Sequence, residues 1–370
     1  MMPIAHPFAL THKLLIAIGT AALLTSCAPL PDHSDKPVAS LRPVIWPELP
    51  DQPRFMLETT LRSPDDIRTR DETEKLRDTL IGDKPKFTPA FNKPYQVAAR
   101  QGMLYVTDTK SRLVHVFDIP HRTFFRMGLR KPGTLSKPIG IALDGDGNVY
   151  VADVSARKVF VYDSLGLYLK EIGIPEELER PTGVAVNSAG TRIYVVDSGG
   201  IDTALHRVIA YDKEGHKLFT IGTRGIQDGQ FNLPTLGAVA PDGTLYVLDA
   251  GNFRVQAFDP DGKFLRKWGQ AGNAPGNFSR PRGIAVDKEG NVYVTDAAFD
   301  NVQIFNAQGQ LLMAMGGPSE DDVKGGYALM GGVAIDETGR VYLVDQAFSK
   351  LDVIRHLSDE EGKRLMTELK

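Results

Sequence analysis

Six aspartates recur at regular spacing and raise the question of catalytic or metal-binding carboxylates. Each ends a Tyr-(Val/Leu)-x-Asp tetrad, and successive tetrads lie 44 to 52 residues apart. The six are Asp108, Asp153, Asp197, Asp249, Asp296 and Asp345. Because an active site needs one asymmetric set of groups, a carboxylate repeated in every unit argues against catalysis. We predict that each aspartate accepts hydrogen bonds from backbone N–H groups in the turn after its strand.

Two further motifs that could carry chemistry are incomplete. Residues 144–148 begin like a calcium loop, but Ser155 stands at the twelfth position, where such a loop needs a bidentate Glu. Ser155-x-x-Lys158 matches a serine–lysine pair without any partner motif. The sequence contains no Gly-x-Ser-x-Gly and no phosphate-binding glycine loop. These motifs do not decide whether the chain is an enzyme, but they favour a chain without catalytic residues, metal or cofactor.

The single cysteine, Cys27, follows an apolar run from Leu14 to Leu24. That run has the length of a signal-peptide core and is too short to span a bilayer. Residues 24–27, Leu-Thr-Ser-Cys, resemble the lipobox of bacterial lipoproteins. The resemblance implies cleavage before Cys27 and a lipid on its thiol. A single cysteine also excludes an internal disulfide.

The residues after Cys27 indicate where the chain resides. Ala28 stands where lipoproteins retained at the inner membrane carry Asp, so the resemblance implies the outer membrane, with the chain facing the periplasm. Residues 27–52 are polar and rich in proline, which is typical of an extended, semi-stiff tether. We therefore expect the membrane, through the lipid on Cys27, to be one partner of the chain.

The stretches around each tetrad predict four short strands per repeat. An apolar strand precedes the tetrad, as in residues 283–287, and a turn with glycine, such as Gly290, separates the two. A third and a fourth strand follow, as in residues 301–306 and 310–316. Four strands in a repeat of about 45 residues form one blade of a β-propeller. The six tetrads therefore predict an all-β, six-bladed propeller built from four-stranded antiparallel blades.

The repeats resemble NHL repeats, most closely in the fourth unit. There, Gly237 to Asp242, Tyr246 to Asp249 and Asn252 to Asp259 follow the NHL pattern. The lead-in at residues 225–234 recurs at residues 272–281. The likeness covers residues 53–356 and implies the propeller fold, but it implies no particular activity, since NHL propellers serve many functions.

The ends of the repeat region predict how the ring closes. The sixth repeat has only three strands before the polar segment 358–362, and an open blade would leave strand edges unpaired. We predict that residues 54–61 supply the missing outer strand, with residues 363–370 as the alternative donor. A small helical insert at residues 62–92, with its helix over 71–81, precedes the first blade.

These elements predict four segments. They are a signal peptide at 1–26, a lipidated tether at 27–52, the propeller at 53–358 and a C-terminal tail at 359–370, with a short helix over 359–369.

Related propellers place metal sites at the starts of their innermost strands. Peptide-amidating lyases with NHL-like repeats bind zinc there through histidines, and lactonases of the senescence-marker type use acidic groups. The residues expected at those positions in this chain include neither kind. They are Tyr95, Ile139, Thr182, Thr235, Arg282 and Gly331. We therefore expect no metal at this end of the channel.

Charge placement on the same face has two interpretations. The charges either steer an anionic partner, or the arginine stems pack over aromatic neighbours and the charges only solvate the loops. The net charge of −3 gives no general basic excess for nucleic acid, which export makes implausible as a partner. The loops that join second to third strands, and blade to blade, share one face and are rich in Lys and Arg. A basic face steers anionic partners toward it. The predicted binding face comprises Tyr95, Thr182, Thr235, Arg282, Arg130 and Arg254.

These observations favour a non-enzymatic binding or scaffold module that holds a protein or an anionic ligand. The alternatives are a lyase or hydrolase whose site, metal-dependent or not, matches no known motif, and a subunit of an envelope complex.

Overall fold

A computed structural model describes residues 42–68 and 88–369. Cys27, the signal peptide, most of the tether and the helix predicted at residues 71–81 lie outside the described residues. The fold described below belongs to the unit that begins at Pro43. Within the described ranges, no helix has the length and apolar character that a membrane span requires.

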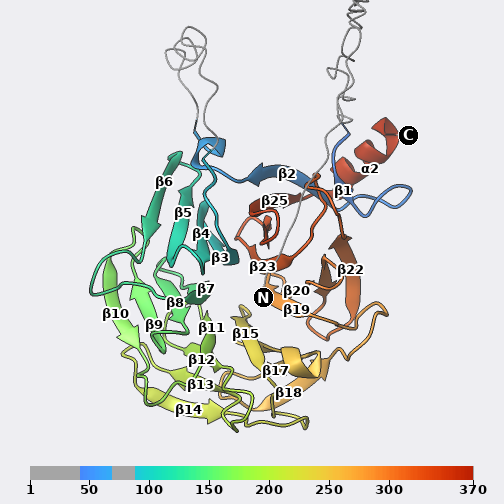
Figure 1. Ribbon diagram of the computed structural model, residues 1–370. Coiled ribbons are helices and arrows are strands. Elements are labelled where there is room, and N and C mark those ends of the chain that lie inside the picture. The colour runs from blue at the N-terminus through green and yellow to red at the C-terminus, as the bar shows by residue number, and fades with distance from the viewer. Residues whose placement is uncertain (1–41, 69–87, 370) are drawn as a thin grey trace, which may run out of the picture. The chain divides into compact units, whose positions relative to one another are not determined.

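Six antiparallel sheets surround a central axis, and each is one blade (Figure 1). Blade one contains β3 (Pro94–Arg100), β4 (Met103–Asp108), β5 (Leu113–Asp118) and β6 (Thr123–Met127). Blade two contains β7 (Pro138–Leu143), β8 (Val149–Asp153), β9 (Lys158–Tyr162) and β10 (Tyr168–Ile172). Blade three contains β11 (Pro181–Val186), β12 (Ile193–Asp197), β13 (Arg207–Tyr211) and β14 (Lys217–Ile221).

The remaining blades repeat this order. Blade four contains β15 (Pro234–Val239), β16 (Leu245–Asp249), β17 (Arg254–Phe258) and β18 (Phe264–Trp268), with a 3-10 turn, η2 (Ala250–Asn252), between β16 and β17. Blade five contains β19 (Pro281–Val286), β20 (Val292–Asp296), β21 (Asn301–Phe305) and β22 (Leu311–Gly316). Blade six contains β23 (Met330–Ile335), β24 (Val341–Asp345) and β25 (Lys350–His356). The predicted six-bladed propeller is confirmed.

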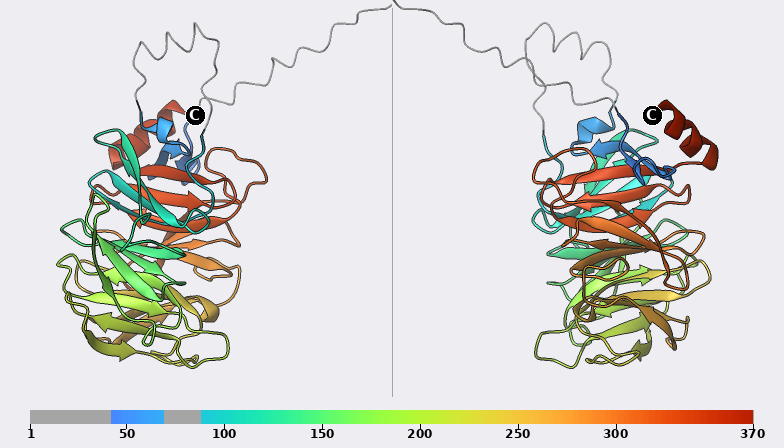
Figure 2. Two further views of the ribbon diagram at one scale, coloured as in Figure 1. Left: turned by 60° about the vertical axis from the view of Figure 1, so that its left-hand side comes forward. Right: turned by 90° about the vertical axis from the view of Figure 1, so that its right-hand side faces the viewer.

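The sequence forms these strands because short runs of β-branched and aromatic residues alternate with glycine turns. In the first turns of blades two and five, Gly147 and Gly290 have φ values of 84° and 86°, a conformation that glycine adopts without steric cost. The second strands are buried along their whole length in blades two to six, because a neighbouring blade covers each face. Figure 2 shows the blades side by side, viewed from the rim.

The ring closes through the N-terminal strand, as predicted. β2 (Phe55–Leu61) pairs antiparallel with β25 and so becomes the outer strand of blade six. β23 also contacts β3, so the innermost strands of the last and first blades meet. The sequence analysis did not anticipate β1 (Ile45–Trp46), which pairs with β2 and adds a fifth strand to this sheet.

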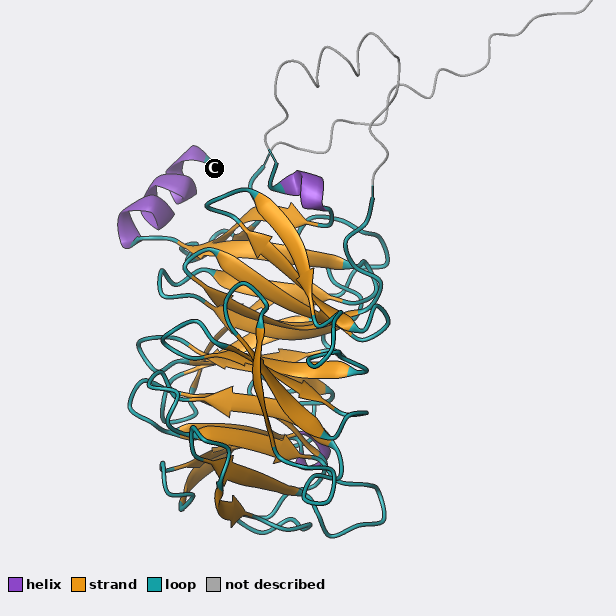
Figure 3. Ribbon diagram, turned by 90° about the vertical axis from the view of Figure 1, so that its left-hand side faces the viewer, coloured by secondary structure: helices purple, strands orange, loops and turns teal. Residues whose placement is uncertain are grey.

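The C-terminal tail forms the predicted helix. Ser358 is the N-cap of α2 (Asp359–Glu368). Its side chain accepts from the Glu361 N–H, and the Glu361 carboxylate accepts from the Ser358 N–H. The helix lies outside the sheets (Figure 3), and Gln52 donates to the Asp359 side chain. A short 3-10 turn, η1 (Pro64–Asp66), follows β2.

Every first strand carries a register shift near its start, between its first residue and its third or fourth. Such β-bulges re-aim side chains at the rims of sheets. The shifted residues include Tyr95, Thr182, Thr235 and Arg282, four of the residues predicted to surround the axis.

Tight packing at the axis explains the glycines of the first strands. A Cβ on Gly183 would lie 2.7 Å from the Thr235 carbonyl oxygen of the next blade. Blade four departs from this rule: Leu236 pairs with Leu248 as Gly283 pairs with Thr295, so Leu236 stands where the repeat has glycine. The alignment that began the fourth repeat at Gly237 was therefore wrong by one residue.

Leu61 lies at the end of β2 and is only 1% exposed. If β2 closes the ring, truncation of this side chain should strongly lower the stability of the fold. Leu61→Ala should lower the free energy of unfolding by about 2–5 kcal/mol, because it leaves a cavity in the core. Urea unfolding followed by tryptophan fluorescence measures this. Leu312→Ala, which truncates a residue 55% exposed, is the matched control and should change it by less than about 0.5 kcal/mol. Equal stability of both variants would contradict closure by β2.

Candidate functional site

The six tetrad aspartates are completely buried and hold the loops that lead into the first strands. Asp296 accepts from the backbone N–H groups of Ser279 and Arg280, at 2.7 and 3.0 Å, and from that of Ala298 in the turn after its own strand. Asp153 accepts four backbone N–H groups in the same arrangement. One carboxylate thus ties the start of a first strand to the end of a second.

Two blades modify this arrangement with arginine. Asp197 accepts from Arg207, and Asp249 accepts from Arg254, in place of backbone donors in the following turn. Both arginines are the first residues of third strands and lie opposite their aspartates. The hydrogen bonds predicted for the following turn are therefore backbone bonds in some blades and side-chain bonds in others.

The hydrogen bonds around Asp108 outweigh the effect of burial on its acidity. Burial raises the pKa of this carboxyl. The His115 ring, with Nε2 at 3.5 Å, and the backbone N–H groups of Ser111, Asn92 and Lys93 lower the pKa further than burial raises it. The pKa therefore lies below the usual range for aspartate, and Asp108 carries its negative charge at neutral pH.

The loops held by these aspartates surround one mouth of the channel, where a cavity of about 350 Å³ opens. Four of the predicted axial residues line it, and they are Tyr95, Ile139, Thr182 and Thr235. Two arginines that the predicted binding face did not include, Arg180 and Arg280, line it as well. The volume lies at the lower end of the range of about 300–1,000 Å³ that is typical of small-molecule pockets.

Arg180 and Arg280 are the charged residues that line this mouth. Both are exposed, and neither makes an ion pair within 4 Å with the residues that the structure describes. Each directly precedes the proline that begins a first strand, and lysine takes that position in blades one and two, at Lys93 and Lys137. This repeated Lys/Arg-Pro pair is the sequence signal that would have identified Arg180.

Hydroxyl groups add polar contacts to the cavity. Thr182 donates to the Thr235 carbonyl oxygen at 2.8 Å, and its hydroxyl lies 2.5 Å from that of Ser198. The Thr235 hydroxyl is buried and has no hydrogen-bond partner within the described ranges. Ser198 in turn donates to the Pro234 carbonyl oxygen, so these hydroxyls hold the wall of the cavity through backbone carbonyl groups.

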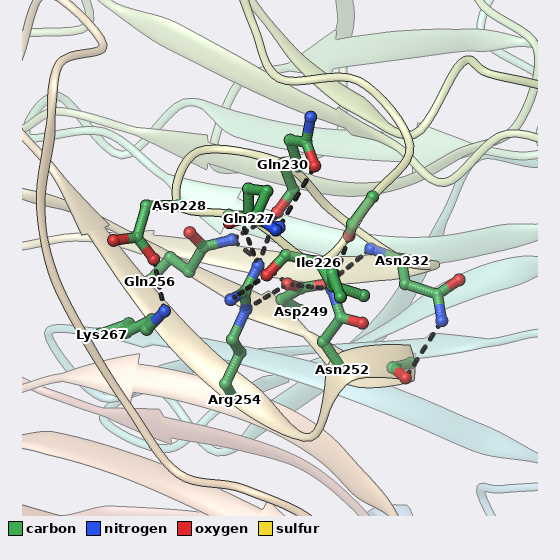
Figure 4. A network of polar contacts seen from close by, with 12 residues as sticks. Ile226, Gln227, Asp228, Gln230, Asn232, Asp249, Asn252, Arg254, Gln256 and Lys267 are labelled. Carbon is green, nitrogen blue, oxygen red and sulfur yellow. Dashed lines mark hydrogen bonds and ion pairs between the residues drawn. The ribbon is translucent and has the colours of Figure 1, made fainter.

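The structure changes the interpretation of the basic face at Arg254. This residue is 6% exposed, and its guanidinium donates to Asp249 and to the carbonyl oxygens of Ile226, Gln227 and Gln230 (Figure 4). Arg254 therefore holds the lead-in loop of blade four and offers no free charge to a partner. Its inclusion in the binding face was wrong.

The two other arginines of the predicted binding face, and Lys350 among the further Lys and Arg of these loops, differ in exposure. Arg130 is exposed and Arg282 is half-buried, and neither forms an ion pair in the part of the chain that is described. Lys350 is 1% exposed and donates to the Gly326 carbonyl oxygen at 2.8 Å, as Arg254 does for its own loop. The usable positive charge of this face is therefore smaller than the sequence indicates and is concentrated near the axis.

Around Asp249, in contrast to Asp108, burial outweighs the hydrogen bonds. Although Asn232, Asn252 and Arg254 lower it, the pKa of Asp249 lies above the usual range because burial has the larger effect. Neutralising Arg254 would remove a main source of charge compensation. The Gln256 side-chain amide also donates to the Asp249 carboxylate, at a longer distance of 3.2 Å.

Two other cavities among the described residues are weaker candidates for a binding site. The opposite mouth, of about 670 Å³, is lined by Asp144, Asp287 and Asp336, and each of these already accepts from a tyrosine hydroxyl. A lateral cavity of about 660 Å³ lies between blades five and six. The described residues contain no group of three or more His, Cys, Asp or Glu side chains placed to hold a metal ion.

Comparison with known proteins supports the fold. Residues 239–315 match a family model described as a 6-bladed beta-propeller. No curated protein matches the sequence.

Several solved structures are similar in fold at low sequence identity. A streptogramin B lyase structure has a TM-score of 0.54 at 12% identity, over 73% of this chain and 96% of the other. A gluconolactonase from Xanthomonas campestris has 0.54 at 17%, over 72% and 87%. A protein of unknown function from Bacteroides thetaiotaomicron has 0.55 at 16%, over 72% and 71%. The family model and the six sheets of the structure together establish that the chain is a six-bladed β-propeller, and the solved structures share its fold.

The buried network predicts that Arg254 serves stability. Arg254→Met should lower the free energy of unfolding by about 3–5 kcal/mol, because it leaves Asp249 buried with reduced compensation. Arg130→Met, on an exposed side chain, is the control and should change it by less than about 0.5 kcal/mol. Chemical denaturation measures both. If Arg254→Met were as stable as Arg130→Met, the carboxylate network would not contribute to stability as argued.

Proposed function

We propose that the chain is a lipid-anchored binding module of the cell envelope, whose propeller mouth holds a small anionic ligand or the acidic group of a protein partner. The observation that carries the proposal is the mouth cavity itself, which is lined by Arg180 and Arg280, two exposed cations without ion-pair partners among the described residues. Exposed cations that converge on a cavity are suited to carboxylates, which arginine binds through two parallel hydrogen bonds.

The arrangement also supports selectivity for small ligands. The cavity is about 350 Å³ and opens at the axis, where side chains from several blades converge. Thr182 and Ser198 line its wall and donate to backbone carbonyl oxygens, which keeps the wall in place. A ligand bound there would exchange water for charged and neutral hydrogen bonds at once.

The anchor is the second part of the proposal and rests on the sequence. Cys27 follows a signal-like segment, and Ala28 follows Cys27. A lipid on Cys27 would hold the chain at the outer membrane, with the propeller in the periplasm. The ligand would then be a molecule of the periplasm or a neighbouring envelope protein.

Titration calorimetry with glutarate tests the binding site, since glutarate offers two carboxylates and no other polar group. We expect binding to the full chain that weakens as salt concentration rises. Arg180→Gln and Arg280→Gln should each weaken it about tenfold or more, because each removes a charge-assisted hydrogen bond. Lys263→Gln neutralises an exposed cation on the opposite face and should leave the affinity within twofold. Absence of glutarate binding, or equal binding by all three variants, would refute this site.

Fractionation of cells that express the Cys27→Ser variant tests the anchor. Wild type should sediment with membranes, whereas the variant should appear in the soluble fraction, because the hydroxyl of serine cannot carry the thioether-linked lipid. The midpoint of thermal unfolding should be the same for both chains, as Cys27 precedes the propeller. Membrane retention of the variant would contradict lipid attachment at this residue.

An enzyme at the same mouth is the second candidate. Its support is the likeness in fold to structures named as a lyase and a gluconolactonase. Turnover of gluconolactone by the purified chain that is lost in Arg180→Gln would favour the enzyme over the binding module.

A further inference from the structure

Blade three has a longer connection between its second and third strands than the other blades. Residues 198–206 join β12 to β13, whereas each other blade makes this connection with four residues, such as 297–300 in blade five. The propeller frame does not need the extra length, because the shorter connections support the same strand pairing. We call residues 198–206 the blade-three loop. Loops on a rigid scaffold are where binding residues are most often placed.

A buried histidine holds the two ends of the blade-three loop together. His206 is completely buried, and the Leu233 N–H donates to its Nδ1 atom at 3.2 Å. The proton of the ring is therefore on Nε2, which donates to the Gly200 carbonyl oxygen at 2.9 Å. His206 thus joins both ends of the loop to the segment that leads into blade four.

Two neighbouring segments hold the middle of the blade-three loop. Thr203 donates to the Glu179 carboxylate at 2.9 Å, in the segment that leads into blade three. In the segment that leads into blade four, the Arg224 N–H donates to the Ala204 carbonyl oxygen at 3.1 Å, and the Arg224 guanidinium donates to the Ile201 carbonyl oxygen. The loop therefore has a defined position against both segments.

This well-supported region exposes large apolar side chains. Ile201 and Leu205, on the blade-three loop, are 70% and 38% exposed. Ile226, on the adjoining segment, is 71% exposed, although Arg254 donates to its carbonyl oxygen at 2.8 Å (Figure 4). Single exposed apolar residues are ordinary, whereas a group of them on ordered, adjoining loops is typical of a site that another protein covers. We call Ile201, Leu205 and Ile226 the apolar surface.

The apolar surface adjoins the mouth cavity. Ser198, the first residue of the blade-three loop, lines that cavity, as does Leu233, which donates to His206. Arg180, an exposed cation of the cavity, directly follows Glu179, which accepts from the same loop. A molecule that enters the cavity and extends over blade three therefore meets first an arginine and then apolar side chains.

A small anion in the cavity would leave the apolar surface in water, whereas a polypeptide can cover both. We infer that the blade-three loop and the mouth together bind one short segment of a partner protein, with large apolar side chains on the apolar surface and a carboxylate at Arg180 or Arg280. Asp202, exposed beside Ile201, repels a segment that is acidic throughout, so the carboxylate belongs at the end toward the axis. This inference rests on the proposed anion site and adds the kind of partner that the site takes.

The exposed isoleucines can be changed without disturbing the fold. Ile201→Ser and Ile226→Ser each remove an apolar side chain from an exposed position. Leu165→Ser is the matched control, because Leu165 is 69% exposed in the turn between β9 and β10, on the opposite face. All three variants should keep the thermal midpoint of the wild-type chain.

Titration calorimetry on the full chain would use peptides with an acetyl group, two leucines, a spacer of one to four glycines, two glutamates and a C-terminal amide. The same peptides with serines in place of the leucines are the reference. We expect at least one leucine peptide to bind about tenfold more tightly than its serine counterpart, because burial of apolar side chains is favourable. Ile201→Ser and Ile226→Ser should each lower this ratio about threefold or more, and Leu165→Ser should preserve it. Arg180→Gln should weaken the leucine peptide as much as it weakens glutarate.

The results separate this inference from the anion site. A leucine preference that the isoleucine variants remove, in a peptide whose binding also needs Arg180 or Arg280, supports the inference. Arginine-dependent binding of glutarate, with equal binding of the leucine and serine peptides, would overturn it and leave the anion site standing. A leucine preference that survives both isoleucine changes, or that is independent of the arginines, would also overturn it. Failure of glutarate and of every peptide to bind would overturn both proposals.

Two further measurements test other occupants of the apolar surface. Sedimentation velocity shows whether the wild-type chain forms a dimer that Ile201→Ser dissociates. Flotation of the Cys27→Ser chain with vesicles of phosphatidylethanolamine and phosphatidylglycerol shows whether Ile201 and Ile226 bind a lipid surface. We expect neither, and either result would assign the surface to a second copy or to a membrane and overturn the inference.

Discussion

A buried carboxylate must be surrounded by hydrogen-bond donors, and the tetrad aspartates draw theirs from two segments of the chain at once. Asp296 shows the principle, because it accepts from Ser279 and Arg280 before the first strand and from Ala298 after the second. The lead-in loop therefore has one stable position relative to the blade. Because that loop carries the residues of the mouth, the site depends on the carboxylate beneath it.

The repeated frame leaves few positions free to vary, and the candidate site is built from those positions. The residues at the register shift of the first strands differ from blade to blade, as Tyr95, Thr182, Thr235 and Arg282 show, and so do the residues just after the tetrads. Arg180 and Arg280 lie just before two of these strands, at a position where four of the six blades have Lys or Arg. A frame with six similar blades can therefore carry a site on one side of its axis. The aspartates hold the frame, and the variable positions distinguish one side of the axis from the other.

Most of the fold can be predicted from the sequence because the same strand pattern recurs in six repeats. Strand order, the closing strand at residues 55–61 and the C-terminal helix follow from apolar alternation, glycine turns and the absence of a fourth strand in blade six. β1 was missed because two residues, Ile45 and Trp46, carry no periodic signal. The helix predicted at residues 71–81 lies outside the described residues.

Prediction of the site was less complete, for a physical reason. Charge counting treats every Lys and Arg in a loop as available, but Arg254 and Lys350 begin third strands, where they point under the lead-in loops and bind carbonyl oxygens. Arg180 was passed over although it belongs to a recurring Lys/Arg-Pro pair. Whether a hydrogen-bonding group such as the Thr235 hydroxyl is left without a partner depends on tertiary packing and cannot be read from sequence.

A crystal structure of the full chain grown with glutarate tests the central claim most directly. The account predicts density for the ligand in the axial mouth, with a carboxylate hydrogen-bonded to Arg180 or Arg280. Ligand density in the lateral cavity between blades five and six, with an empty mouth at saturating ligand, would contradict it.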